Sequence, residues 1–265
     1  MSAQRSTAFR VRVTILLAVL IGVITYAIRD VRHRRARNDW DHTLEIALVV
    51  LTLGHVDPAA TDALRTRAEM LAARLHEERG RYRAGAPRPF AFRVYGPVPI
   101  AAPPPEPASD GIGDLARFAW EKHEYLADVD ARASIDVGAH DVRVYVVATP
   151  AKATERAFVE GLSEDGGSVG FVKVELDLTM VDFALSVAAH ELFHTLGATD
   201  KYDAQGRTKV PEGLAEPGSR AATAQRYVEI MARGRPVARG REVLLDSLDK
   251  VAVGPSTAAE IKWSP

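Results

Sequence analysis

Hydrophobic and polar positions in the first half of the chain alternate between strand-like and helix-like periods. Residues 44–54 form an apolar run rich in β-branched side chains that ends at a glycine, which predicts a buried strand. From Pro58 onwards, leucines, a methionine and alanines recur at helical spacing, so a helix of about twenty residues is expected to end near Gly80. Residues 89–98 alternate as a second strand, whereas the proline-rich residues 101–111 predict a loop.

The second half of the chain continues this alternation and indicates the fold class. Its expected order is helix, three strands and helix, followed by a glycine- and proline-rich region with two short helices. We therefore predict an α/β or α+β fold, with a twisted mixed β-sheet backed by helices. The elements expected in the second half are a helix over 112–132, a strand over 140–150, two strands joined by a glycine-rich turn within 156–177, a helix over 180–196, and short helices over 219–232 and 255–262.

The N-terminal segment 13–28 is apolar and uncharged, and arginines lie on both sides of it. It is short for a membrane-spanning helix but long enough for a signal peptide, with Thr25-Tyr26-Ala27 as a cleavage site; a buried core helix is a third interpretation. Because a dense basic run follows directly, we prefer an uncleaved membrane anchor. The predicted divisions are a basic tail over 1–12, the anchor or signal peptide over 13–28, a basic juxtamembrane linker over 29–40 and a globular domain over 41–265.

The charge distribution and the absence of cysteine narrow the possible functions. The formal net charge is −1, and the basic excess is confined to the first 37 residues, which hold eight arginines and one aspartate. The globular part therefore has no basic patch typical of nucleic-acid binding. The chain has no cysteine, which excludes disulfides, zinc–thiolate sites and thiol nucleophiles. Any metal must be bound by His, Asp or Glu.

The stretch AAHELFHTLGATDKYD, residues 188–203, carries a candidate metal site. On a helix His190 and His194 lie one turn apart on the same face, where two neutral imidazoles can bind one zinc ion. Glu191 lies beside them and is offset enough to reach a water on the metal without binding the ion. Catalytic zinc usually has three protein ligands and one open position, so a third ligand is needed.

Asp200 is the expected third ligand, and Gly197 provides the turn that would bring it to the histidines. Glycine tolerates the left-handed conformation that ends a helix, so a sharp turn at Gly197 would bring Asp200 back towards the two histidines. Glu212 or Glu216 could serve instead, as in thermolysin-like sites. That glutamate normally lies on a second helix, however, and the sequence around these two residues does not predict one.

The pattern His190-Glu191-x-x-His194-x-x-Gly197-x-x-Asp200 resembles the metzincin zinc peptidases, in particular the snapalysin-like subset with aspartate as third ligand. The resemblance implies a methionine turn, for which Met231 is available. It also implies a sheet above the helix and an edge strand that holds the peptide substrate in extended form, here expected at 170–175. Several metzincins carry tyrosine two residues after the methionine, where this chain has Arg233; Tyr202 is a possible replacement as donor to the oxyanion.

The expected function is that of a Zn²⁺-dependent metallopeptidase in which Glu191 acts as general base on a peptide or protein substrate. We expect a single-pass membrane protein with its catalytic domain outside the cytoplasm, or a secreted one if the N-terminal segment is cleaved. Two alternatives stay open. One is a zinc-stabilised interaction or scaffold domain without catalysis, which would not need Glu191. The other is a zinc hydrolase that acts on a bond other than a peptide. The sequence does not predict an oligomeric state.

Overall fold

The computed structural model describes residues 7–109, 111–151, 160–163 and 167–264. The chain divides into two compact units, residues 1–39 and residues 40–265.

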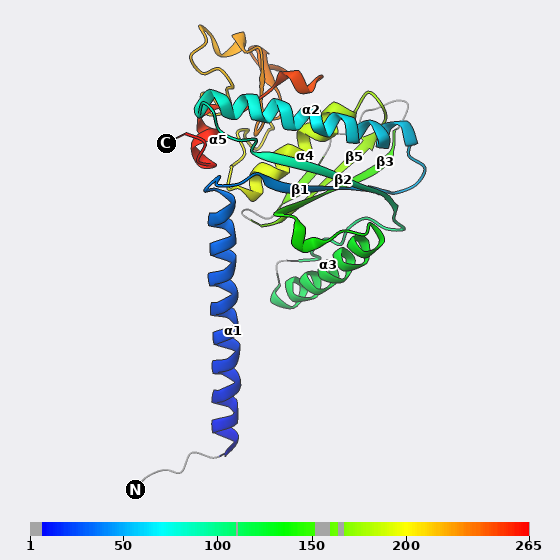
Figure 1. The fold of residues 1–265 in the computed structure, drawn as a ribbon, viewed down its shortest axis with the longest axis vertical. Helices are drawn as coiled ribbons and strands as arrows, with labels where there is room; N and C mark the ends of the chain where they lie inside the picture. Colours follow the sequence, from blue (N-terminus) through cyan, green and yellow to red (C-terminus); the bar gives the residue numbers. More distant parts are fainter. Residues whose placement is uncertain (1–6, 110, 152–159, 164–166, 265) are drawn as a thin grey trace. The chain divides into compact units, whose positions relative to one another are not determined.

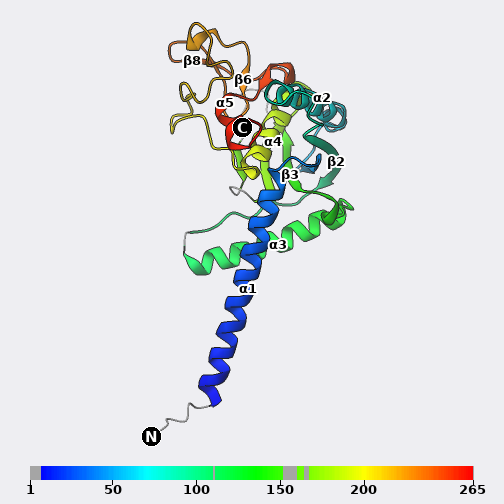
Figure 2. The same cartoon turned by 60° about the vertical axis from the view of Figure 1, so that its left-hand side comes forward.

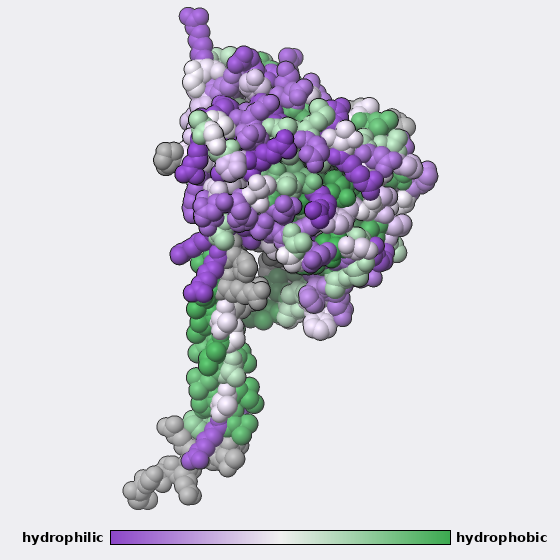
Figure 3. Space-filling model, in the orientation of Figure 1, coloured by the Kyte–Doolittle hydropathy of each residue, from purple (hydrophilic) through white to green (hydrophobic). Residues whose placement is uncertain are grey.

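The first unit contains one long helix, α1 (Thr7–Arg37). Large apolar side chains from Val11 to Ile28 are exposed along it, and Figure 3 shows them as a green surface. In the part of the chain that the structure describes, no helix is apolar over a stretch long enough to cross a membrane. The membrane helix predicted at 13–28 is therefore not supported. The helix also continues without interruption into the predicted linker at 29–40.

A five-stranded sheet forms the centre of the second unit and confirms the expected mixed α/β architecture (Figure 1). Its strand order is β2-β1-β3-β5-β4, in which the first four strands are parallel and β4 is antiparallel to β5. The strands are β1 (Leu44–Thr52), β2 (Phe90–Pro99), β3 (Val142–Pro150), β4 (Glu160–Ser163) and β5 (Val169–Leu176).

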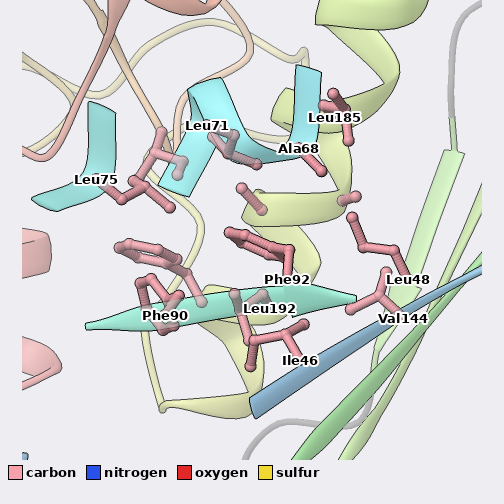
Figure 4. Packing of buried hydrophobic residues seen from close by; sticks show 14 of the residues in the cluster. Ile46, Leu48, Ala68, Leu71, Leu75, Phe90, Phe92, Val144, Leu185 and Leu192 are labelled. Atoms are coloured by element: carbon pink, nitrogen blue, oxygen red, sulfur yellow. The ribbon is translucent and has the colours of Figure 1, made fainter. Parts of the chain in front are cut away.

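Helices cover both faces of this sheet, which explains why its central strands are apolar on both sides. Ile46 and Leu48 of β1 face α2 (Pro58–Tyr82) and α4 (Val181–Thr195) in the larger core, shown in Figure 4. The alternate residues Ala47 and Val49 face α3 (Ile112–Arg132) in a smaller core. Asp57 caps the start of α2 by accepting a hydrogen bond from the Ala59 N–H (2.9 Å).

The edge strand of the sheet differs from the expectation. The segment 170–175, predicted to be the edge, lies in β5, which pairs with β3 on one side and with β4 on the other. The edges of the described sheet are instead β2 and β4, and β4 is the edge strand next to β5. Hydrophobic alternation identifies both strands of this hairpin but carries no information on which of them pairs with β3, so the sequence could not distinguish them.

The chain after α4 consists mainly of loops with short elements, and the helix predicted over 219–232 is wrong. The Gln225 side chain bonds the backbone of Glu216 in both directions, and β6 pairs with β9, so long-range pairing overrides the helix propensity of the alanines. The helix expected over 255–262 is present as α5. The short elements after α4 are η2 (Ala222–Ala224), β6 (Val228–Glu229), β7 (Arg235–Ala238), β8 (Arg241–Val243), η3 (Leu248–Lys250), β9 (Val251–Ala252) and α5 (Pro255–Glu260). A further 3₁₀ turn, η1 (Val137–Ala139), lies between α3 and β3.

Candidate metal centre

Helix α4 places His190 and His194 side by side, as the sequence predicts. Ala189, Leu192 and Phe193 of this helix are buried in the larger core, so its orientation is fixed by packing. The two imidazoles project from the same face, and their Nε2 atoms lie 3.1 Å apart. Their side chains are mostly shielded from solvent, with 12% of each exposed.

Backbone carbonyl groups determine which nitrogen of each imidazole is available. The Nδ1 atom of His190 lies 3.0 Å from the carbonyl oxygen of Ile230, and that of His194 lies 2.9 Å from the carbonyl oxygen of Ala198. A carbonyl oxygen only accepts hydrogen bonds, so each Nδ1 must carry the proton. In the neutral rings both Nε2 lone pairs therefore point to the same place, as in histidines that bind metals.

Gly197 ends the helix by the expected turn. Its φ angle is +91°, in the left-handed region, and nothing lies within 4 Å of the position that a Cβ would occupy. The Ala198 N–H donates to the carbonyl of Phe193 (3.0 Å) and the Gly197 N–H to that of His194 (2.9 Å), which is the Schellman pattern. This turn reverses the chain and brings Asp200 to the two histidines.

The Asp200 carboxylate completes a triangle of three donor atoms. Its Oδ1 atom lies 3.2 Å from Nε2 of His190 and 3.3 Å from Nε2 of His194. Ligand atoms of tetrahedral zinc, each 2.0–2.1 Å from the ion, are about 3.3 Å apart. The spacing, together with two imidazoles and one carboxylate as donors, fits Zn²⁺ better than Mg²⁺ or Ca²⁺, which prefer oxygen ligands.

The charges at this triangle are strongly coupled. Burial alone would raise the pKa of Asp200, but the two adjacent imidazoles hold that pKa well below its usual value. Burial lowers the pKa of His194, yet Asp200, Glu191 and the Ala198 carbonyl together raise it above its usual value. The three donor atoms therefore form a site for a positively charged species, either a proton or a metal cation.

Glu191 lies next to the triangle in a buried position. Only 3% of the residue is exposed. The potential ligand atoms of His190, Glu191 and His194 lie within 4.8 Å of one another. The carboxylate is therefore close enough to exchange a proton with a water molecule at the site, which is the role predicted from the sequence.

Tyr202 and Arg233 form a stack beside His190 that the sequence did not predict. The Tyr202 ring stacks on the His190 ring, with centroids 6.1 Å apart, and the Arg233 guanidinium carbon lies 4.6 Å from the Tyr202 centroid. Burial and the neighbouring negative charge of Asp200 raise the pKa of Tyr202, while Arg233 opposes the increase. The Tyr202 side chain thus lies close enough to the predicted third ligand to feel its charge.

Met231 lies in a turn next to the centre. The residue is fully buried, its carbonyl accepts the Lys201 N–H (2.9 Å), and its own N–H donates to the Glu229 carboxylate (2.6 Å). The preceding residue is Ile230, whose carbonyl orients His190. The turn therefore connects the segment after Asp200 with the segment that orients His190.

The alternative third ligands do not reach the centre. The Glu216 carboxylate accepts hydrogen bonds from the Arg226 backbone N–H (2.8 Å) and guanidinium (3.1 Å). Glu212 is exposed in a turn. Sequence reasoning did not identify Glu260, which binds Thr199 across 61 residues, or Glu229, which accepts a hydrogen bond from the backbone of Met231.

Comparison with known proteins adds no family assignment. No protein-family model matches the chain, and no curated protein is significantly similar to it. The interpretation of the centre therefore depends on its motif and on the distances between its own side chains.

Proposed function

We propose that the chain is a zinc-dependent endopeptidase in which His190, His194 and Asp200 hold the metal. The observation that carries this proposal is the convergence of three electron-pair donors within 3.3 Å, with both Nδ1 atoms engaged by backbone carbonyls. Three lone pairs facing one another repel unless a cation or a proton lies between them. The zinc interpretation requires no rearrangement of the described residues.

When bound, zinc supplies a Lewis acid that lowers the pKa of water and polarises a carbonyl oxygen. Glu191 takes the proton of the attacking water and then delivers it to the leaving amine. Its buried position keeps bulk water from competing for that proton. Tyr202 lies beside Asp200, and its hydroxyl is our candidate donor to the oxyanion once substrate is present.

The metzincin resemblance suggests how a peptide binds. An edge strand can pair with an extended peptide through backbone hydrogen bonds. In the described part of the sheet the edge next to β5 is β4, whose only strand partner is β5. We therefore propose β4 as the strand along which the substrate lies, in place of residues 170–175.

Two other functions remain as alternatives, and Glu191 distinguishes the first of them. A scaffold domain stabilised by zinc would use the three ligands but would gain nothing from a buried carboxylate beside them, and burial of an unneeded carboxylate is costly. A hydrolase acting on a non-peptide bond would use the same residues and is separated by a substrate screen. A location outside the cytoplasm stays a prediction from the sequence.

The experiment that tests the proposal compares the full-length chain with Glu191→Ala and Asp200→Ala. We expect the parent to bind one zinc ion per chain and to cleave a peptide library. Glu191→Ala should bind zinc without cleaving, and Asp200→Ala should lose most of the metal. Zinc binding without cleavage of any peptide would refute the peptidase assignment, and absence of zinc binding by the parent would refute the metal centre.

A further inference from the structure

The carboxylate of Glu260, at the end of α5, binds the chain on both sides of Asp200. It accepts hydrogen bonds from the Thr199 N–H (2.9 Å) and the Thr199 hydroxyl (2.8 Å). It also accepts two from the Lys201 ammonium group, at 2.8 and 2.7 Å. One carboxylate thus accepts four hydrogen bonds from the residues immediately before and after the proposed third ligand.

The four hydrogen bonds of Glu260 with Thr199 and Lys201, here called the clamp, are partly protected from solvent, and those with Lys201 are charge-assisted. Only 4% of the Lys201 side chain is exposed, and 31% of that of Glu260. Hydrogen bonds between ionised groups are about twice as strong as neutral ones. Burial would raise the pKa of Glu260, but Lys201 and Thr199 lower it below its usual value, so the carboxylate is charged at neutral pH.

Glu260 is itself held in a fixed position by the core. Just after it, the carbonyl of Ile261 accepts a hydrogen bond from the Trp40 indole (2.7 Å). Trp263 packs edge to face against Phe193, which lies on α4 directly before His194, with ring centroids 5.8 Å apart. Figure 2 shows α5 next to α4. The segment around Glu260 therefore contacts both α4, through Trp263, and the loop that carries Asp200, through Thr199 and Lys201.

We propose that Glu260 is a positioning residue for the metal centre, which fixes the backbone around Asp200 so that its carboxylate meets the two histidines before metal arrives. This inference rests on the proposed metal site. Groups that orient metal ligands typically contribute about 10- to 100-fold to metal affinity. A Glu260 that only attached α5 to the fold would affect stability and leave the metal affinity of the folded protein unchanged.

The test measures zinc affinity by competition with a chromophoric chelator, together with the visible absorption spectrum of the Co²⁺-loaded protein. The variants are Glu260→Ala and the isosteric Glu260→Gln. The matched control is Glu216→Gln, because Glu216 also accepts a backbone N–H and pairs with a basic side chain, but at Arg226, away from the centre. Far-UV circular dichroism and urea unfolding of the metal-free proteins report on folding.

We expect Glu260→Ala to weaken zinc binding by about 10- to 100-fold and to change the Co²⁺ spectrum. Glu260→Gln should show a smaller change in the same direction, and Glu216→Gln should match the parent. A folded Glu260→Ala with parental affinity and spectrum would overturn the positioning role while leaving the metal centre intact. If Glu260→Ala does not fold, an unchanged Glu260→Gln overturns it. Failure of the parent to bind metal would refute the metal centre instead.

Discussion

Replacing Gly197 by alanine isolates the backbone turn that delivers Asp200. The φ angle of +91° lies in the left-handed region, and a left-handed conformation costs a residue with a Cβ atom about 1–2 kcal/mol. The added methyl group meets no atom within 4 Å, so no steric clash contributes. We therefore expect Gly197→Ala to lower the free energy of unfolding by about 1–2 kcal/mol. Gly197→Asn should cost less, because asparagine adopts this conformation more readily.

Gly80 provides the matched control for this substitution. It lies in the last turns of α2, its added Cβ would also meet nothing within 4 Å, and its φ is not in the left-handed region. Alanine is the better helix former, so Gly80→Ala should raise the free energy of unfolding by up to about 1 kcal/mol. Urea unfolding of the metal-free proteins, followed by circular dichroism, measures both changes. A Gly197→Ala protein as stable as the parent, or equal effects at the two glycines, would show that the left-handed conformation of Gly197 does not favour glycine at this turn.

Three further predictions concern side chains at and away from the centre. Glu191→Gln should retain zinc affinity and lower kcat by about 10²- to 10⁴-fold, measured on a cleaved peptide, because the amide cannot accept the proton. Tyr202→Phe should lower kcat with little change in KM if the hydroxyl serves the oxyanion, as steady-state kinetics can determine. Glu216→Gln should cost about 0–1 kcal/mol at pH 7, because its pair with Arg226 is partly exposed. Burial raises the pKa of Glu216, but the Arg226 backbone N–H and guanidinium lower it overall. The contribution of this pair to the free energy of unfolding is therefore fully present above pH 4.5 and is lost as the pH falls below that value.

Each of these predictions has an outcome that contradicts it. A Glu191→Gln enzyme with parental kcat would exclude the general-base role. A loss of zinc affinity in Tyr202→Phe, with kcat unchanged in the loaded enzyme, would assign Tyr202 to Asp200 alone. A stability difference between Glu216→Gln and the parent that grows as the pH falls would contradict the assigned direction of the Glu216 pKa shift.

The parts of the centre that were predictable from the sequence are local. His190, Glu191 and His194 follow from one turn of helix geometry, and Gly197 marks the end of that helix by its own conformational freedom. The placement of Asp200 depends on the same turn, three residues further on. All of these relations act within eleven residues of chain.

The parts that were not predictable depend on contacts between distant segments. Glu260 binds Thr199 across 61 residues, and the Ile230 carbonyl binds His190 across 40. Neither relation leaves a periodic pattern in the sequence. The same limit explains two of the errors in the fold, since the position of β4 at the sheet edge and the pairing of β6 with β9 are decided by tertiary contacts.

X-ray absorption spectroscopy of the zinc-loaded full-length chain tests the central claim most directly, because it counts the ligands and measures their distances. We expect one zinc ion per chain bound by two imidazoles and one carboxylate, with ligand distances of about 2.0–2.2 Å and an oxygen of water as the remaining ligand. The Asp200→Ala protein should lose the carboxylate contribution. A chain that binds no zinc, or zinc whose coordination shell contains one imidazole or three, would show that His190, His194 and Asp200 do not form the proposed zinc site.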